Sequence, residues 1–332
     1  MRRYDTVKAI SRSSRLVAAL AATTGLLLAG CSTGAGQPNA AVIIGDKVIP
    51  VSDVQHKLDA GVAVRADYQQ LRDQHKLDQA GRAILSVLIR QELAGRLAQR
   101  EGVPVSDSAV DAVMARIGGT VPDDAFPAYD LQGVRDLVRS QLEAEAVGKK
   151  YATRTAVTFD AVFATTRAEA MAKAKQMAKG EEAIRQLVKD ETAKKQQATL
   201  GTTLNFAQAK ASYAVSPLFG TAAGTIVAFP VADDSGQLEQ QTTPTSQWMV
   251  AHVRSRNTGA PAPANPAGGQ QTPEGMSQLY VPLGLSMISM LGDELGMQVN
   301  PRYGVWDLVK TQLVPSTGEK AAFQIKAGTT AS

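Results

Sequence analysis

Few residues in this chain of 332 are of the types that usually carry chemistry. It has one cysteine and three histidines, which are His56, His75 and His252. No two histidines stand at the short spacings of metal-ligand pairs, and no second cysteine accompanies them, so the sequence predicts no metal site. A Gly-x-Ser-x-Gly turn and a phosphate-binding glycine loop are both absent. We therefore expect no catalytic residue, no metal ion and no cofactor.

The single cysteine, Cys31, follows a leader of the kind that directs export. Basic residues occur at five of the first fifteen positions, and residues 16–30 are apolar or small except for Thr23 and Thr24. A basic stretch followed by a short apolar run and small residues is typical of a secretory signal peptide. The apolar run is shorter than the ~20 residues that a membrane-spanning helix needs. Residues 1–30 are therefore predicted to be a signal peptide.

The end of this leader, Leu28-Ala29-Gly30-Cys31, resembles the bacterial lipobox. The resemblance implies a diacylglyceryl group on the Cys31 thiol, cleavage before Cys31, and acylation of the new amino group by a fatty acid such as palmitate. A lone free thiol would be a liability in an oxidising compartment, and a lipidated one is not. We expect a lipoprotein on the extracytoplasmic face of the cell membrane, with residues 31–39 as a flexible tether. The alternative is a plain secreted protein whose signal contains a cysteine.

The formal net charge of +4 belongs to the leader. Removing residues 1–30 takes away five basic residues and one acid, which leaves thirty of each. A neutral mature chain gives no reason to expect nucleic acid as a partner. About 300 residues suffice for two modest domains.

Residues 40–154 are predicted to form a helical domain. It opens with two short strands around Gly45 and Asp46, after which Ser52 is the expected N-cap of a helix that starts at Asp53. Three later helices are indicated by apolar residues three and four positions apart: Leu85, Leu88, Ile89, Leu93 and Leu97 before Gly102; Ala109, Val110, Val113 and Ile117 after Ser106; and Leu131, Val134, Val138 and Leu142 up to about Tyr151.

Residues 155–256 have the pattern of a small α+β domain. The expected elements are a strand over 156–163, helices over 166–179 and 181–195, and strands over 224–229 and 248–253. Residues 257–273 are rich in Pro, Gly and Ala and are predicted to be a linker. Residues 274–315 contain an apolar helix and an extended segment, and residues 316–332 are predicted to be a disordered tail. The fold class is therefore mainly α with a small α+β part.

Three stretches resemble the SurA/PrsA-type extracytoplasmic foldases and chaperones, in the actinobacterial form of the SurA N-terminal domain family. They are Ala41–Asp53 (AVIIGDKVIPVSD), Leu88–Asp107 (LIRQELAGRLAQREGVPVSD) and Val299–Gly304 (VNPRYG). The resemblance implies that the 41–51 hairpin and the 299–306 segment pack together. The α+β domain would then be an insertion, and the protein would bind unfolded or newly secreted polypeptide clients.

The strand and helix order of the α+β domain resembles parvulin, the peptidyl-prolyl isomerase module. The match is degenerate, because the first strand, Phe159–Phe163, lacks the family's histidine and residues 196–218 lack its Gly-rich turn. Trp248 lies nearest the place of the second histidine, with His252 four residues later. Asp160 is a candidate polar group for an isomerase site, but the favoured interpretation is that it is exposed or caps a turn. The resemblance therefore implies a domain whose isomerase site is lost.

An apolar cleft between the two domains is the expected place for a client. Met276, Met287, Met290 and Met297 are four of nine methionines, and methionine suits promiscuous apolar binding, so Met287, Met290 and Trp248 are candidate client-binding residues. The favoured reading of the apolar 283–295 helix is nevertheless that it packs in the core. Two other functions stay open. One is a non-catalytic scaffold of the cell envelope, and the other is a solute-binding lipoprotein of a transporter, which the helical run 53–150 argues against.

Overall fold

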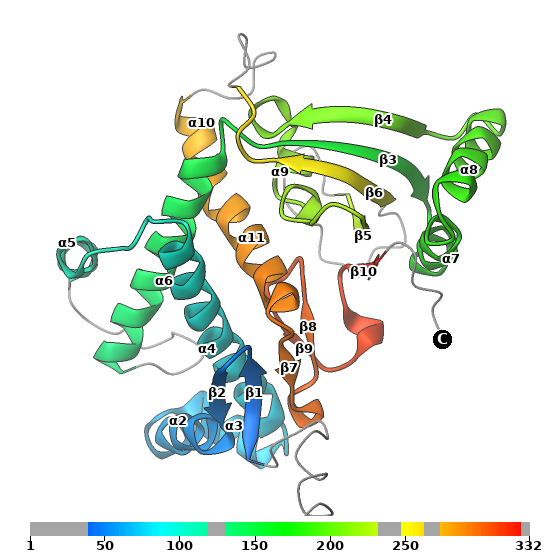
Figure 1. Cartoon of the computed structure of the whole chain (residues 1–332). Coiled ribbons are helices and arrows are strands. Elements are labelled where there is room, and N and C mark those ends of the chain that lie inside the picture. Colours follow the sequence, from blue (N-terminus) through cyan, green and yellow to red (C-terminus); the bar gives the residue numbers. More distant parts are fainter. Residues whose placement is uncertain (1–38, 119–129, 232–246, 262–272, 327–332) are drawn as a thin grey trace, which may run out of the picture. The chain divides into compact units, whose positions relative to one another are not determined.

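The computed structural model of the chain describes residues 39–118, 130–231, 247–261 and 273–326 (Figure 1). The predicted signal peptide, Cys31 and the tether up to Pro38 lie outside these residues, as does most of the predicted linker. No helix within the described ranges combines the length and the apolar character that crossing a bilayer requires.

The described chain begins with the predicted hairpin. Strands β1 (Ala40–Ile44) and β2 (Lys47–Pro50) pair antiparallel around Gly45, whose φ of 58° suits a residue without a side chain. Helix α2 (Val51–Val64) follows at once, with Pro50 at the N-cap position and no side chain capping it. The prediction that Ser52 caps a helix starting at Asp53 is therefore wrong, and the Ser52 hydroxyl lies inside the first turn and donates to Asp53.

The helical part continues with four helices: α3 (Ala66–Asp73), α4 (Leu77–Arg100), α5 (Asp107–Arg116) and α6 (Leu131–Tyr151). Helix α4 is buried along most of its length because α2, α3 and α6 all pack against it. The predicted helix signals are confirmed here. Gly102 has φ 65° just beyond α4, and the Ser106 hydroxyl accepts a hydrogen bond from the backbone N–H of Ala109 at the start of α5.

A five-stranded antiparallel sheet with the strand order β10-β5-β6-β3-β4 forms the α+β part. Its strands are β3 (Ala156–Ala164), β4 (Ala198–Asn205), β5 (Thr225–Pro230), β6 (Trp248–Asn257) and β10 (Phe323–Lys326). Helices α7 (Arg167–Met177) and α8 (Glu181–Ala193) cover one face. The short elements η1 (Phe206–Gln208), α9 (Ala211–Ala214) and η2 (Pro217–Phe219) lie on the other. The predicted strands and helices of this region are confirmed, and β4 is an addition.

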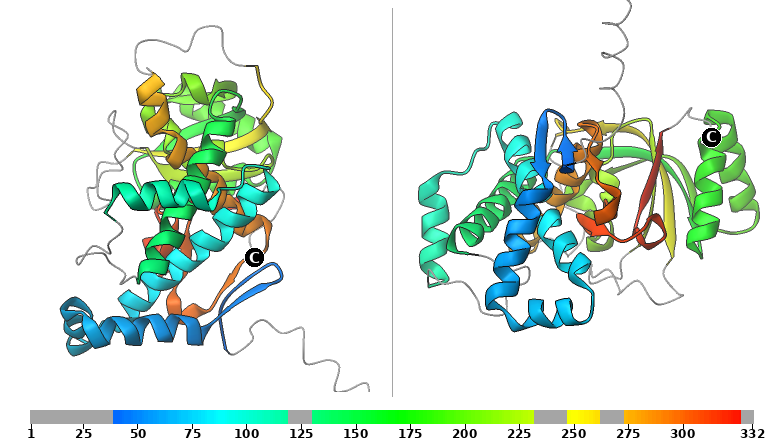
Figure 2. Two further views of the ribbon diagram at one scale, coloured as in Figure 1. Left: turned by 90° about the vertical axis from the view of Figure 1, so that its left-hand side faces the viewer. Right: turned by 90° about the horizontal axis from the view of Figure 1, so that it is seen from below.

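The C-terminal segment returns to the N-terminal hairpin (Figure 2). It consists of α10 (Pro273–Gln278), α11 (Tyr280–Glu294), β7 (Gln298–Val299), η3 (Pro301–Tyr303), β8 (Val305–Asp307) and β9 (Gln312–Val314). Val299 pairs with Val42 across the sheet, and the Asn300 side chain donates to the Ala40 carbonyl oxygen at 3.0 Å. The expected association of the 41–51 hairpin with the 299–306 segment is thus confirmed.

The chain after Pro315 departs from the prediction of a disordered tail. Residues Phe323–Lys326 form β10, which pairs with β5 from Phe323↔Ala228 to Lys326↔Thr225. The prediction is therefore wrong for the described part of this tail, residues 316–326, which also contains the short helix η4 (Thr317–Glu319). The error has a physical cause, because a four-residue strand has too little pattern of its own and is fixed by the neighbour it pairs with.

Helix α11 joins the helical part to the sheet. It packs on α4 and α6 on one side and on η2 on the other. At these contacts a side chain on Gly148 would overlap the backbone of Tyr280, one on Gly284 the backbone of Ala144, and one on Gly220 that of Ser286. A continuous hydrophobic core therefore runs from α4 through α11 to the sheet. In the described ranges, backbones meet at Gly284 and Gly220 where a client cleft was expected, but cavities of about 400 and 120 Å³ remain between α11, the C-terminal segment and strands β5 and β10.

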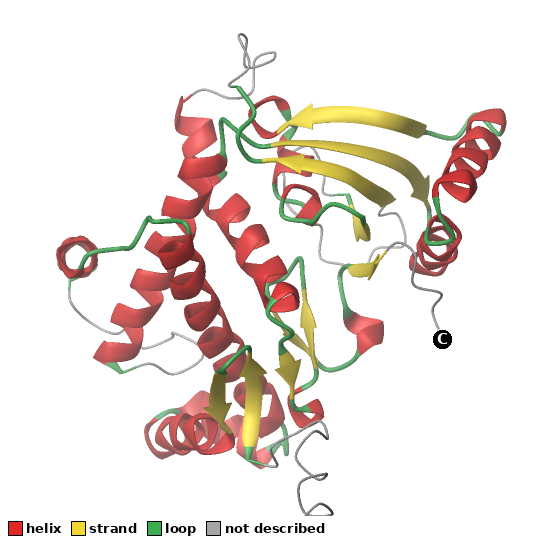
Figure 3. Cartoon of the chain, in the orientation of Figure 1, coloured by secondary structure: helices red, strands yellow, loops and turns green. Residues whose placement is uncertain are grey.

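The fold class is mainly α with a small α+β part, as predicted (Figure 3).

We predict that Gly284→Ala lowers the free energy of unfolding by about 3 kcal/mol, because the new methyl group forces α11 away from α6. Urea unfolding followed by circular dichroism measures this. The control is Gly95→Ala in α4, whose methyl would lie 3.9 Å from its nearest neighbour, an ordinary contact distance. Its free energy of unfolding should equal that of wild type or exceed it by up to about 1 kcal/mol. Equal stability of the two variants would contradict the close approach.

Candidate functional site

A groove of about 680 Å³ opens in the helical part between β2, α2, α4 and α6. This volume lies within the range of about 300–1,000 Å³ that is typical of ligand sites. Its lining combines apolar, polar and charged side chains: Lys47, Ile49, Asp53, His56, Lys57, Leu88, Gln91, Glu92, Gly95, Gln99, Asp136, Arg139, Ser140 and Glu143. The groove lies among helices and not between two α/β lobes, the position that a solute-binding lipoprotein would require.

Each helix contributes one face to the groove. The lining positions follow the spacing i, i+3, i+4, which places side chains on one side of a helix. They are Asp53, His56 and Lys57 on α2; Leu88, Gln91, Glu92, Gly95 and Gln99 on α4; and Asp136, Arg139, Ser140 and Glu143 on α6. Sequence reasoning missed this site, because a polar stripe at helical spacing looks the same whether it faces bulk water or a groove.

Glu143 is the buried acid of the groove, with 8% of its surface exposed. Its two carboxylate oxygens lie over Gly95, where a Cβ atom would be 3.9 and 4.0 Å away. No hydrogen bond or ion pair to Glu143 occurs within the part of the chain that the structure describes. The nearby Arg139 is engaged elsewhere, since its guanidinium donates to Asp107 and to the Val105 carbonyl oxygen.

Burial raises the pKa of Glu143 from 4.5 to about 6, and the charge of Arg139 offsets only part of this. The folded state therefore holds the proton more tightly than the unfolded state. The contribution of Glu143 to stability therefore falls as the pH rises from about 4.5 to about 6 and is level above that. At neutral pH the ionised carboxylate costs the fold at most about 2 kcal/mol, and water in the groove reduces this cost.

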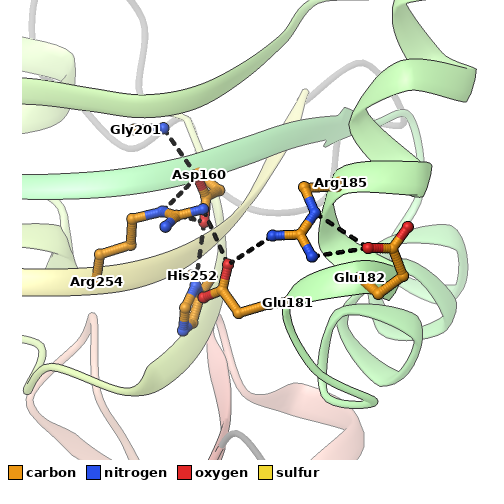
Figure 4. Close-up of polar contacts among 7 residues, drawn as sticks. All are labelled: Asp160, Glu181, Glu182, Arg185, Gly201, His252 and Arg254. Carbon is orange, nitrogen blue, oxygen red and sulfur yellow. Dashed lines mark hydrogen bonds and ion pairs between the residues drawn. The ribbon is translucent and has the colours of Figure 1, made fainter.

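A second polar group of residues lies inside the sheet part (Figure 4). Asp160 on β3 is fully buried, and its carboxylate accepts hydrogen bonds from Nδ1 of His252 at 3.1 Å and from the backbone N–H of Gly201 at 2.8 Å. Arg254 donates from Nε to both carboxylate oxygens, at 2.8 and 2.7 Å, and from its other end to Glu181 at 3.1 Å. We call these five residues the Asp160 cluster.

Two irregularities in strand pairing build the Asp160 cluster. The register between β3 and β6 shifts where Thr158 faces Ser255 and Phe159 faces Val253, which leaves Arg254 as an extra residue in β6. A second shift in β4 sets Gly201 at φ 61° with its N–H directed to Asp160. Such bulges re-aim side chains and backbone groups at the expense of regular pairing.

Desolvation would raise the pKa of Asp160, but the hydrogen bonds from His252, Arg254 and Gly201 outweigh it, so the pKa is lowered from 3.8. Both oxygens of the carboxylate are occupied, and the side chain is shut off from solvent. The Asp160 cluster therefore ties β3, β4, β6 and the first turn of α8 together. The expectation that Asp160 is exposed or caps a turn is therefore wrong, because Asp160 is buried and accepts from Gly201 at a bulge inside strand β4.

We predict that Asp160→Ala lowers the free energy of unfolding by about 3 kcal/mol at pH 7, since it leaves His252 and Arg254 without their acceptor. A lowered folded pKa stabilises the fold above the unfolded value of about 3.9, and this contribution is lost as the pH falls through the folded pKa. The difference from wild type should therefore shrink at pH 3, as measured by urea unfolding. Glu182→Ala is the control, because Glu182 is exposed and its ion pair among the described residues is with Arg185. An equal effect of Asp160→Ala at both pH values would contradict the argument.

The candidate client-binding residues do not form one surface. Met287 and Met290 on α11 are 7% and 4% exposed and belong to the core shared with α4. Trp248 belongs to the core on the other side of the sheet and stacks on Phe323 with ring centres 6.1 Å apart. The burial of Met287 and Met290 supports the interpretation that the α11 methionines pack in the core. The described ranges contain no group of three His, Cys, Asp or Glu residues placed to hold a metal ion.

Comparison with known proteins gives distant likenesses alone. No family model matches the chain, and no curated protein matches its sequence. Among solved structures, it is similar to the foldase protein PrsA from Lactococcus lactis, with 10% identity over 79% of this chain and 94% of that chain and a TM-score of 0.26. The foldase protein PrsA from Streptococcus pneumoniae matches with 13% identity over 71% and 91% and a TM-score of 0.24. Likenesses of this degree establish no shared site.

Proposed function

We propose that the chain is a chaperone-like lipoprotein that holds segments of unfolded or newly secreted polypeptides in the groove of its helical part. The observation that carries the proposal is the composition of that groove: Ile49 and Leu88 supply apolar surface, and charged and amide side chains surround them. An unfolded segment presents apolar side chains together with backbone N–H and C=O groups that need partners. A groove with both kinds of lining suits such a segment better than a purely apolar pocket would.

The proposal assigns no isomerase activity to the sheet part. Lowering the barrier to imide rotation, which is about 20 kcal/mol, requires polar groups in contact with the bond. Asp160 and His252 are the polar pair nearest to such a role, and they are 0% and 6% exposed and bonded to each other. The sequence departures from parvulin favour the same conclusion.

The proposal places the protein on the extracytoplasmic face of the cell membrane, held by a lipid on Cys31. The leader and the Leu28–Cys31 lipobox support this. Residues 32–39 could extend at most about 28 Å, given about 3.5 Å per residue. A tether of that length keeps the groove within reach of chains that emerge from the membrane, and the SurA/PrsA-like stretches 41–53 and 88–107 point to the same class of protein.

We predict that the purified protein suppresses the aggregation of a chemically denatured client at an equimolar ratio, measured by light scattering. Gly95→Leu should weaken suppression several-fold, because its side chain would fill the groove above Glu143, whereas Gly95→Ala should leave it unchanged. Full suppression by Gly95→Leu would move the client site elsewhere. No suppression by wild type, with one stable partner recovered by pull-down, would favour a scaffold.

We predict that the full chain, expressed in bacteria fed labelled palmitate, carries the label and sediments with the membrane fraction. Cys31→Ser should lose the label and the membrane association, because the anchor depends on the Cys31 thiol. Ser32→Ala is the matched control next to it and should behave as wild type. Label retained by Cys31→Ser would contradict lipidation at this residue.

A further inference from the structure

The floor of the groove holds an acid without a partner. Glu143 is more than nine-tenths buried, lines the groove, and has no hydrogen bond or ion pair within the described residues. Burial of most of its side chain raises its pKa to about 6, so at neutral pH it is ionised, with its carboxylate facing the groove. A buried charge of this kind is destabilising unless an opposite charge or hydrogen-bond donors approach it. No described residue supplies such a partner, so it comes from water in the groove or from a molecule that displaces that water.

The charges around Glu143 do not supply that partner. Arg139 is committed to Asp107 and the Val105 carbonyl oxygen. Lys47 and Lys57 line the groove but are exposed, so water solvates their ammonium groups. The cations of the lining are therefore at its exposed edge or already paired, and the buried charge is negative.

Two further acids of the lining have no cationic partner among the described residues. Asp53 and Asp136 accept hydrogen bonds from neutral side chains, the hydroxyl of Ser52 and the amide of Gln132. These bonds leave both charges unneutralised. Glu92, by contrast, is paired with Arg96. The groove is thus complementary to a positive group that passes between the exposed acids and reaches Glu143.

Gly95 leaves space through which such a positive group can reach Glu143. Because it has no side chain, the carboxylate of Glu143 is uncovered on the α4 side. Leu88 and Ile49 lie in the same lining and offer apolar surface to an aliphatic stem. A long side chain with an apolar stem and a cationic end matches this arrangement.

We propose that the groove binds the lysine or arginine side chain of a client segment, with Glu143 as its counter-ion. This rests on the proposed function, that the groove binds polypeptide, and names the residue type that it selects. A guanidinium or ammonium group donates several hydrogen bonds, and hydrogen bonds between charged groups are the stronger ones. The cation restores to Glu143 the partner that the described fold does not give it.

The test uses three labelled, unstructured peptides of one apolar sequence with a central arginine, citrulline or glutamate. Citrulline keeps the shape of arginine without its charge. Binding to the full-length protein is measured by fluorescence anisotropy at pH 7.5. Wild type should bind the arginine peptide about tenfold more tightly than the citrulline peptide and should bind the glutamate peptide most weakly. Glu143→Gln should reduce the preference to less than twofold without weakening the citrulline peptide. Glu145→Gln, an exposed acid on the same helix, should change nothing.

Equal affinity of wild type for the arginine and citrulline peptides would overturn this inference and leave the proposed function standing. A preference that survives Glu143→Gln would also overturn it, since another acid would then be the counter-ion. Binding of none of the peptides would overturn it as well, and the aggregation assay with Gly95→Leu would then decide separately whether the groove holds clients. The wild-type comparison of peptides stands even if a variant fails to fold.

Discussion

The close approach of backbones around α11 is the constraint on which the rest of the structure depends. Gly148 and Gly284 let α11 and α6 touch main chain to main chain, and Gly220 does the same for η2. With larger residues at these places the helices would separate and the core that joins the helical part to the sheet would open. The same packing fixes α6, whose Asp136–Glu143 face is then free to form one wall of the groove.

The buried carboxylates of Asp160 and Glu143 differ in how many hydrogen-bond donors surround them. Asp160 is surrounded by donors from the two neighbouring strands, β4 and β6, and its pKa is lowered. Glu143 is nearly as buried but has no donor within the described chain, and its pKa is raised. Burial is common to both, so the supply of partners distinguishes them. A saturated carboxylate holds strands in place, whereas an unsaturated one that lines a groove is suited to receive a ligand.

The sequence predicted the structural features that depend on residues close together in the chain. Apolar periodicity located the helices, and local chemistry marked Gly102 and Ser106 as helix ends. The sequence did not predict the contacts between residues that are far apart in the chain. His252 and Asp160 meet because β3 and β6 pair in one particular register, and β10 exists because β5 offers it an edge. The sequence did not predict the groove for the same reason. Its three polar helix faces form a binding surface only when the fold brings them together.

The pairing of Val42 with Val299 and of β5 with β10 sets an order of events for the growing chain. Synthesis delivers β1 and β5 well before β7 and β10. Until the last segment arrives, one edge of each early strand is open, and open edges recruit strands from other molecules. Both sheets are completed only after residues 298–326 have been made, so late strands close the edges that β1 and β5 leave open.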